Sequence, residues 1–298
     1  MEFALGTCTI ASGAASAKRG SACFSRVVAG LALALLATIP ASVHAGDGSS
    51  APATSNGPLL ITLGSNAVYG PRFEGSKRHD LGPWPIISWR HRGDKEWLDM
   101  PTDGMDLALV ETDKFRMGPV GYWRWQRDAG ASPRGFAQVG QGKRSIELSL
   151  EAGGFAEYWP VEWLRTRLEV RESVVGAKGL VAIASSDLVW KPDRQWTMAA
   201  GPRLSFGDSR FMTSYYGVDA SQSATSGLPT YSAQAGIRSF GAGMLIRNKI
   251  SESWMVQGFA DYQHLTGSAG DSPVISTRGT PEQFLVGMGV SYTFKAPW

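Results

Sequence analysis

The sequence predicts an all-β protein, a transmembrane antiparallel β-barrel of the bacterial outer membrane with about 12 strands (10–14). Three observations predict this class. After residue 45 no stretch approaches the 18 consecutive apolar residues of a membrane helix. Apolar residues instead alternate with small or polar ones in many runs, which is the strand signature. Aromatic residues gather near the ends of these runs, as they do at bilayer interfaces.

The first 45 residues are expected to be a cleaved signal peptide. Three basic residues precede an uncharged apolar run at residues 27–40, and small residues that suit a signal peptidase follow. The alternative, a retained membrane anchor, needs about 20 apolar residues, and this run is shorter. Residues 46–57, rich in Ser, Ala and Gly, are expected to form a flexible leader. Residues 58–298 are then expected to form a single barrel domain.

Removal of the signal peptide changes what charge and cysteine content imply. The chain has 29 Lys+Arg and 26 Asp+Glu, of which residues 1–45 hold three and one, so 26 and 25 remain. Charges of both signs are mixed, without the basic stripe that a nucleic-acid partner requires. Both cysteines, Cys8 and Cys23, lie in the signal region. The mature chain therefore has no thiol for a disulfide, a zinc site or a nucleophile.

Alternation is clearest near the C-terminus. Even positions from Phe284 to Phe294 are all apolar, while odd positions are mostly small or polar. The even face is therefore expected to contact lipid and the odd face to line the lumen. Two other clear runs lie at residues 146–152 and 164–171. Weaker runs occupy residues 59–69, 83–90, 105–110, 120–126, 180–185, 196–206, 231–240 and 254–264.

A soluble β-sandwich alternates in the same way, so other features must favour a membrane barrel. The best runs approach the length of about 9–11 residues that a tilted membrane strand needs, against about 5–6 in soluble proteins. Aromatic residues near the strand ends suit interfacial girdles. They are Tyr69, Trp84, Trp89, Trp123, Trp125, Trp159, Trp163, Trp190, Trp196 and Trp254.

One hairpin permits a sharper prediction. If Pro160 marks a turn and the hairpin is centred near Val161, Glu157 lies opposite Arg165 and Glu151 opposite Arg171. All four positions are odd, so the pairs would form a charge ladder in the lumen. Such a ladder would either create an ion-selective constriction or simply fill a narrow barrel.

The residues offer little support for an enzyme. The mature histidines, His79, His91 and His264, lack metalloprotease spacing. Ser76 near His79 and Ser272 near His264 are the pairs that an outer-membrane lipase would need, but a Ser-rich chain yields such pairs by chance. We therefore expect no enzymatic activity, no metal site and no cofactor.

Gly-rich, turn-forming segments at residues 74–80, 128–143, 219–230 and 266–281 are expected to be the long connections, which usually face outward in such barrels. Six residues in them are candidates for contact with a partner, although their types are also simply what turns require. These candidates are Glu74, Gly75, Ser76, Asp271, Ser272 and Pro273.

Five short elements follow one another along the mature chain. They are Tyr69-Gly70-Pro71-Arg72-Phe73-Glu74-Gly75-Ser76, Gly118-Pro119, Leu150-Glu151-Ala152-Gly153-Gly154-Phe155-Ala156-Glu157-Tyr158, Tyr215-Tyr216-Gly217-Val218 and Leu265-Thr266-Gly267-Ser268-Ala269-Gly270-Asp271-Ser272-Pro273-Val274. In order and spacing they resemble the MltA-interacting protein (MipA)/OmpV family of outer-membrane proteins. Two departures are Phe73, where Tyr is usual, and the four residues that follow Phe294, where the chain normally closes.

This resemblance implies a location in the outer membrane, in contact with its lipid. The member that names the family scaffolds a lytic transglycosylase and a bifunctional penicillin-binding protein during murein growth. Our leading expectation is therefore a non-enzymatic scaffold that binds such partners through periplasmic turns or rim residues. The alternative is a small-solute channel or a surface adhesin.

Overall fold

The computed structural model describes residues 57–124, 149–176 and 178–296. The proposed signal peptide, nearly all of the leader, Trp125, the connection at residues 128–143 and Trp298 lie outside these residues. Ten long strands of 10–14 residues dominate the described chain. They are β1 (Leu59–Pro71), β2 (His79–His91), β5 (Phe115–Arg124), β6 (Ser149–Val161), β7 (Leu164–Val175), β8 (Leu180–Trp190), β9 (Trp196–Gly207), β10 (Gly236–Lys249), β11 (Trp254–Leu265) and β12 (Glu282–Lys295).

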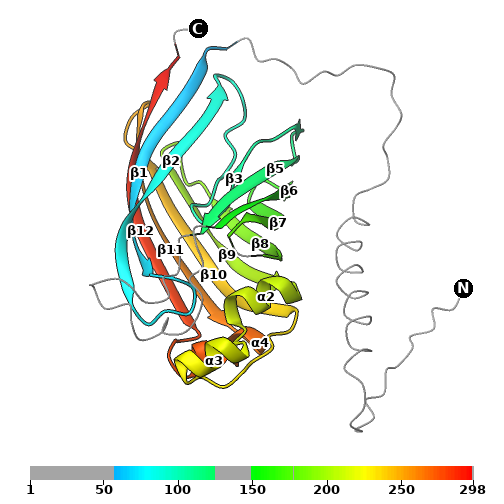
Figure 1. Cartoon of the computed structure of the whole chain (residues 1–298). Helices are drawn as coiled ribbons and strands as arrows, with labels where there is room; N and C mark the ends of the chain where they lie inside the picture. The colour runs from blue at the N-terminus through cyan, green and yellow to red at the C-terminus, as the bar shows by residue number, and fades with distance from the viewer. Residues whose placement is uncertain (1–56, 125–148, 177, 297–298) are drawn as a thin grey trace, which may run out of the picture. The chain divides into compact units, whose positions relative to one another are not determined.

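Two strands of two residues, β3 (Met105–Asp106) and β4 (Val110–Glu111), complete a 12-stranded antiparallel sheet. Its order is β2-β1-β12-β11-β10-β9-β8-β7-β6-β5-β3, with β4 also paired to β5. The sheet curls around an interior, so the last strand lies beside the first (Figure 1). The predicted fold class, an outer-membrane β-barrel of 10–14 strands, is confirmed.

The two faces of the sheet follow the parity that the sequence indicates. On β12, Phe284, Met288 and Tyr292 are exposed, whereas Gln283 and Ser291 are buried on the inner face. The inner face of β7 carries three buried arginines, and its other face carries exposed Val170. This inversion of the soluble pattern, apolar outside and polar inside, is that of a sheet whose outer face meets lipid.

Aromatic residues line both ends of the outer face. Trp163, Trp190 and Trp254 are exposed at the end where the described chain starts and finishes, and Tyr69 and Phe240 are exposed at the other. Two predicted girdle residues were assigned to the wrong face: Trp159 points inward and belongs to a buried apolar cluster, and the partly buried Trp84 packs against that cluster. Proximity to a strand end does not determine the face, which depends on register.

The connections at the two ends differ in length. At the end that carries Leu59 and Lys295, β6–β7, β8–β9 and β10–β11 are joined by turns of two to five residues. The opposite end carries the described long connections and the short helices α2 (Ser209–Tyr216), α3 (Ala220–Ser226), α4 (Gly267–Gly270) and α5 (Pro273–Ser276). We call the first the termini end and the second the loop end. The strand expected at residues 231–240 starts only at Gly236, because Tyr231 forms a bridge with Val218 in the long connection.

The described sheet has one seam, between β2 and the β3–β4 strip. No ladder joins these elements in the described residues. Arg92, which directly follows β2, donates its N–H to the Pro58 carbonyl on the side of β1. Successive N–H groups along a strand point in opposite directions, so the odd residues of β2 direct theirs to the free edge. Pro83 and Pro85 are odd and have no N–H, which reduces the unpaired donors at this edge.

None of the helices in the described part of the chain is both long and apolar enough to cross a membrane.

The outer face gives a prediction about stability. Met288 lies in the middle of β12 with 70% of its surface exposed, whereas Ile250, 62% exposed, lies in a turn. Met288→Arg should lower the free energy of unfolding in lipid vesicles by about 2–4 kcal/mol, because a charge at mid-bilayer is desolvated. Ile250→Arg should cost only about 0–1 kcal/mol. Equal effects in urea titrations would contradict the assignment of this face to lipid.

Candidate functional site

The chain between β2 and β5 enters the interior of the barrel. We call residues 92–111 the lumen segment. Trp97, Leu98 and Met100 of this segment are buried in one apolar cluster. The cluster also contains inward side chains from strands all around the sheet: Val68, Trp159, Val189, Ala199, Leu245 and Phe259. The lumen is therefore filled by apolar packing on the termini side.

Three aspartates of the lumen segment bind arginines of the barrel wall. Asp99 contacts Arg116 Nη2 at 2.8 Å, and Asp103 contacts Arg165 Nη2 at 2.5 Å. Asp106 contacts Arg167 Nη1 at 2.6 Å. The arginine side chains are almost completely buried. These pairs hold the segment against β5 and β7 by charge as well as by packing.

Glu157 of β6 is the centre of the charge network. Its carboxylate is fully buried and accepts from Arg116 Nε at 3.0 Å, Arg165 Nη2 at 2.8 Å and Arg167 Nη1 at 3.1 Å. The Trp159 indole N–H donates to the same carboxylate at 2.8 Å. A buried carboxylate bound by four side chains is strongly anchored, because its removal would leave three buried arginines short of a compensating charge.

The hairpin that carries this network differs in register from the prediction. Glu157 lies opposite Arg167, and Arg171 lies opposite Gly153. Pro160 does not turn the chain but belongs to β6, and the turn falls after Val161, which pairs with Leu164. The proposed partners still meet diagonally: Glu157 contacts Arg165, and Arg171 Nε contacts Glu151 Oε2 at 3.3 Å. Whether this ladder selects ions stays a prediction.

Farther along the interior, the network continues to a small cavity of about 40 Å³. Its lining includes Asp103, Arg167, Arg203, Arg238 and Asp261. Arg203 Nη2 contacts Asp187 at 2.7 Å, but its Nε has no hydrogen-bond partner, and neither has Asp261 Oδ2. Both side chains are buried. A polar cavity with free donors and acceptors can hold water or a small polar ligand.

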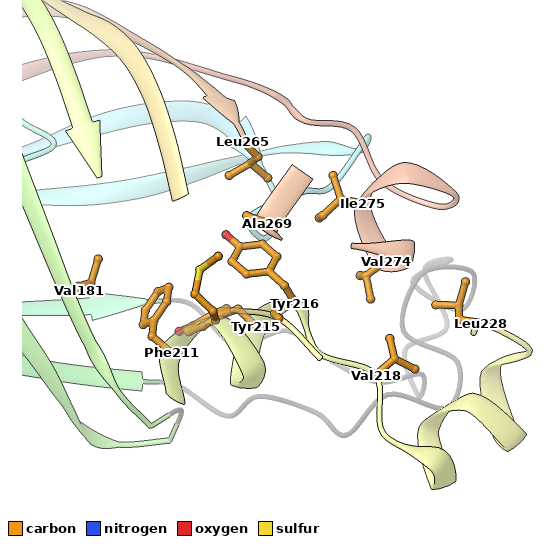
Figure 2. Packing of buried hydrophobic residues seen from close by; sticks show 12 residues of the cluster. Val181, Phe211, Tyr215, Tyr216, Val218, Leu228, Leu265, Ala269, Val274 and Ile275 are labelled. Atoms are coloured by element: carbon orange, nitrogen blue, oxygen red, sulfur yellow. The ribbon is translucent and has the colours of Figure 1, made fainter. Parts of the chain in front are cut away.

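At the loop end a second apolar cluster closes the interior. Figure 2 shows Tyr216 of α2 directed toward Ala269 and Leu265, while Phe211 and Tyr215 lie together on the side toward Val181. We call this cluster, with α2 to α5, the helical cap. Asp208 starts α2 by accepting from the Phe211 N–H at 2.7 Å.

Glu74 ties the β1–β2 turn to this cap. Arg238 Nη1 donates to both of its carboxylate oxygens, at 2.7 and 2.6 Å, and Arg124 Nη1 lies 3.3 Å away. The Tyr216 hydroxyl donates to the same carboxylate. Burial and the neighbouring Glu74 carboxylate raise the pKa of Tyr216 well above its usual value, so the phenol remains a donor.

The six candidate loop residues are thus brought together, but mostly inside the cap. Gly75 adopts φ +93°, and a Cβ there would lie 2.0 Å from Ile275 Cδ1. Ser76 is buried, as are Ser272, which donates to the Tyr216 carbonyl at 2.6 Å, and Pro273. Only Asp271 is exposed. Five of them therefore make contacts within the cap, and contact of any of the six with a partner stays a prediction.

The serines and histidines considered for catalysis have other partners. Ser76 Oγ donates to the Arg78 carbonyl, and Ser272 Oγ to the Tyr216 carbonyl. His264 Nδ1 lies 2.8 Å from Glu282, and His79 stacks on Tyr69. Across the described residues, no cluster of three or more His, Cys, Asp or Glu side chains could hold a metal ion.

Comparison with known proteins agrees with this architecture. The model of the MltA-interacting protein MipA family matches residues 63–294, which is most of the chain. The chain belongs to this family. The match runs from β1 to the end of β12, so the lumen segment and the helical cap both lie inside the family domain. The resemblance expected from the sequence is confirmed.

Solved structures with similar folds are outer-membrane proteins of low sequence identity. An outer membrane channel from Pseudomonas putida F1 is 9% identical in sequence. The match covers 84% of this chain and 100% of the chain of that channel, with a TM-score of 0.42. The NanC porin has 9% identity, covers 78% and 98%, and gives 0.37. Because both TM-scores are below 0.5, the family assignment rests on the family model alone. No curated protein matches the chain.

Sequence reasoning missed two parts of the site. A strand was expected at residues 105–110, where the structure has only β3 and β4, but the entry of residues 92–104 into the lumen was not expected. A signal was present, because Trp97, Leu98 and Met100 are the only large apolar residues in the stretch 92–103. The helices of the cap were also missed, because alternation identifies strands and the long connections were assigned as loops. Asp208 and Asp219, which both cap helices, were the available signals.

The lumen segment predicts a pH dependence. Burial raises the pKa of Asp103, but Arg165 and Arg167 outweigh burial and hold it below its usual range. A carboxylate with a lowered folded pKa stabilises the fold above its unfolded pKa, and this contribution is lost as the pH falls. Asp103→Asn should lower the free energy of unfolding by on the order of 3 kcal/mol at pH 7. In urea titrations the difference from wild type should shrink progressively below about pH 4. A difference independent of pH would contradict this ion pair.

The cap gives a second prediction. Glu74→Ala leaves the buried Arg238 and Arg124 without their shared carboxylate, which should destabilise the cap by about 3–5 kcal/mol. Hydrogen exchange of the α2 and α5 amides should then accelerate, while that of β7 should stay unchanged. Lys77→Ala, an exposed change in the same turn, is the matched control. Unchanged exchange in Glu74→Ala would show that Glu74 does not hold the cap.

Proposed function

We propose that this protein is a non-enzymatic outer-membrane scaffold for murein-remodelling enzymes. The expected partners are a lytic transglycosylase and, as in the family resemblance, a penicillin-binding protein. Membership in a family described as MltA-interacting protein supports a protein partner. The proposal includes export by a signal peptide at residues 1–45 and a periplasmic position of the termini end.

The observation that carries this proposal is the filled lumen. The apolar cluster around Trp97 occupies its termini side, buried ion pairs occupy its middle, and the helical cap closes the loop end. A barrel filled in this way offers surface rather than an open pore. A role in binding proteins needs only surface.

The surface available on the termini end is built by short turns. The β8–β9 turn is the most charged, with Lys191, Asp193 and Arg194 all exposed. Asp193 is needed by the turn itself, because its carboxylate accepts from the N–H groups of Gln195 and Trp196, each at 2.8 Å. Lys191 and Arg194 are therefore free to change without loss of the turn.

A crosslinked pull-down from solubilised envelopes tests the proposal. Tagged wild-type protein should enrich murein hydrolases and synthases, identified by mass spectrometry, over an unrelated barrel. Lys191→Ser with Arg194→Ser should reduce this enrichment, since an exposed rim charge contributes to association. Asp271→Ser, at the opposite end, is the control and should retain it. Enrichment no greater than that of the unrelated barrel would refute the scaffold.

A small-solute channel is the second candidate, favoured by the charged interior and its cavity. It predicts discrete conductance of the refolded protein in planar bilayers, which a permanently filled scaffold lacks. A surface adhesin instead predicts binding of host matrix or cells by the loop end, with loss of binding when the connection at residues 128–143 is replaced. The same protein preparation can be used in both assays.

A further inference from the structure

The barrel wall by itself carries more positive than negative charge in its interior. Among the described strand residues that are buried, six are arginines and five are carboxylates. The arginines are Arg116, Arg165, Arg167, Arg171, Arg203 and Arg238, and the carboxylates are Glu151, Glu157, Glu169, Asp187 and Asp261. Arg124 and Arg247 also point inward, to Glu151 and Gln257. The strand residues thus leave an excess of three positive charges in the interior, and Glu74 of the β1–β2 turn offsets one of them by binding Arg124 and Arg238.

The lumen segment supplies the negative charge around Arg116, Arg165 and Arg167. Its three aspartates contact Arg116, Arg165 and Arg167. Residues 92–104 of the segment belong to no strand, so side-chain contacts hold this part in place. The aspartates therefore act as an internal anionic ligand of the arginine wall.

A cavity and an unpaired hydrogen-bond donor lie beside the aspartates of the lumen segment. The cavity of about 40 Å³ is lined by Asp103, Arg167 and Arg203, among others. The Arg203 side chain is more than nine-tenths buried, and its Nε has no hydrogen-bond partner. An unsatisfied guanidinium donor favours a carboxylate or a similar acceptor.

We propose that the arginine wall of the lumen is a binding site for a polycarboxylate solute, which binds in exchange for the aspartates of the lumen segment. The ligand class follows from the charge: three carboxylates leave and an anion of similar charge replaces them. This site does not depend on the scaffold function, because its ligand is a solute rather than a protein. Its failure would leave the pull-down result unaffected.

Titration calorimetry of the refolded protein with citrate tests the exchange. Citrate should bind, whereas spermidine and chloride at matched ionic strength should not. Asp103→Asn removes one internal competitor and raises the fraction of protein whose site is accessible. The apparent affinity for citrate is proportional to this accessible fraction, so it should rise about tenfold if the fraction rises tenfold. Asp113→Asn, an exposed change just outside the segment, should bind like wild type.

Three results would overturn the proposal: no citrate binding, equal heats with matched chloride, or an Asp103→Asn variant that binds citrate no more tightly than wild type. If Asp103→Asn does not refold, a second measurement decides. Met100→Cys, in a chain with Cys8→Ser and Cys23→Ser, places a buried thiol in the segment. Citrate should accelerate its reaction with a maleimide several-fold by displacing the segment. An unchanged rate would refute the exchange.

Discussion

The interaction on which the interior depends is the binding of three buried arginines by Glu157. Its carboxylate contacts Arg116, Arg165 and Arg167 with no solvent exposure. Each of these arginines also binds at least one aspartate of the lumen segment. A guanidinium cannot lose its charge, so it must be compensated wherever water is excluded. The aspartates of the lumen segment supply part of this compensating charge, and their ion pairs with the arginines hold the segment inside the barrel.

This constraint connects the layers of the interior. The apolar cluster around Trp97 lies on the termini side of the ion pairs, and the cap lies at the loop end, tied to the wall by Glu74, Arg124 and Arg238. In a soluble protein such packing would be the core and the outer face would be polar. Here the outer face is apolar because it contacts the bilayer, and the inner face is polar because its charged side chains pair with one another and with the lumen segment.

The fold class and the faces of the three clear runs were predictable because alternation is local: Phe284 to Phe294 separates its own apolar face from its polar face. The partners Glu157 and Arg165 were predictable because both lie on one hairpin, although the register was shifted by two residues because Pro160 extends a strand. The contacts of Asp103 and Glu74 were not predictable. They join residues 62 and 164 positions apart, to Arg165 and Arg238, and depend on how the barrel curls.

The most direct test of the filled lumen is a disulfide between the segment and the wall. A Cβ on Gly104 would lie 2.3 Å from a methyl carbon of Val120, so Gly104→Cys and Val120→Cys place two thiols within bonding reach, in a chain with Cys8→Ser and Cys23→Ser. The structure predicts nearly complete oxidation in the folded barrel, seen as a mass loss of two hydrogens. Gly104→Cys with the outward Met288→Cys should not crosslink. Free thiols in a folded Gly104→Cys/Val120→Cys barrel would contradict a segment packed inside the lumen.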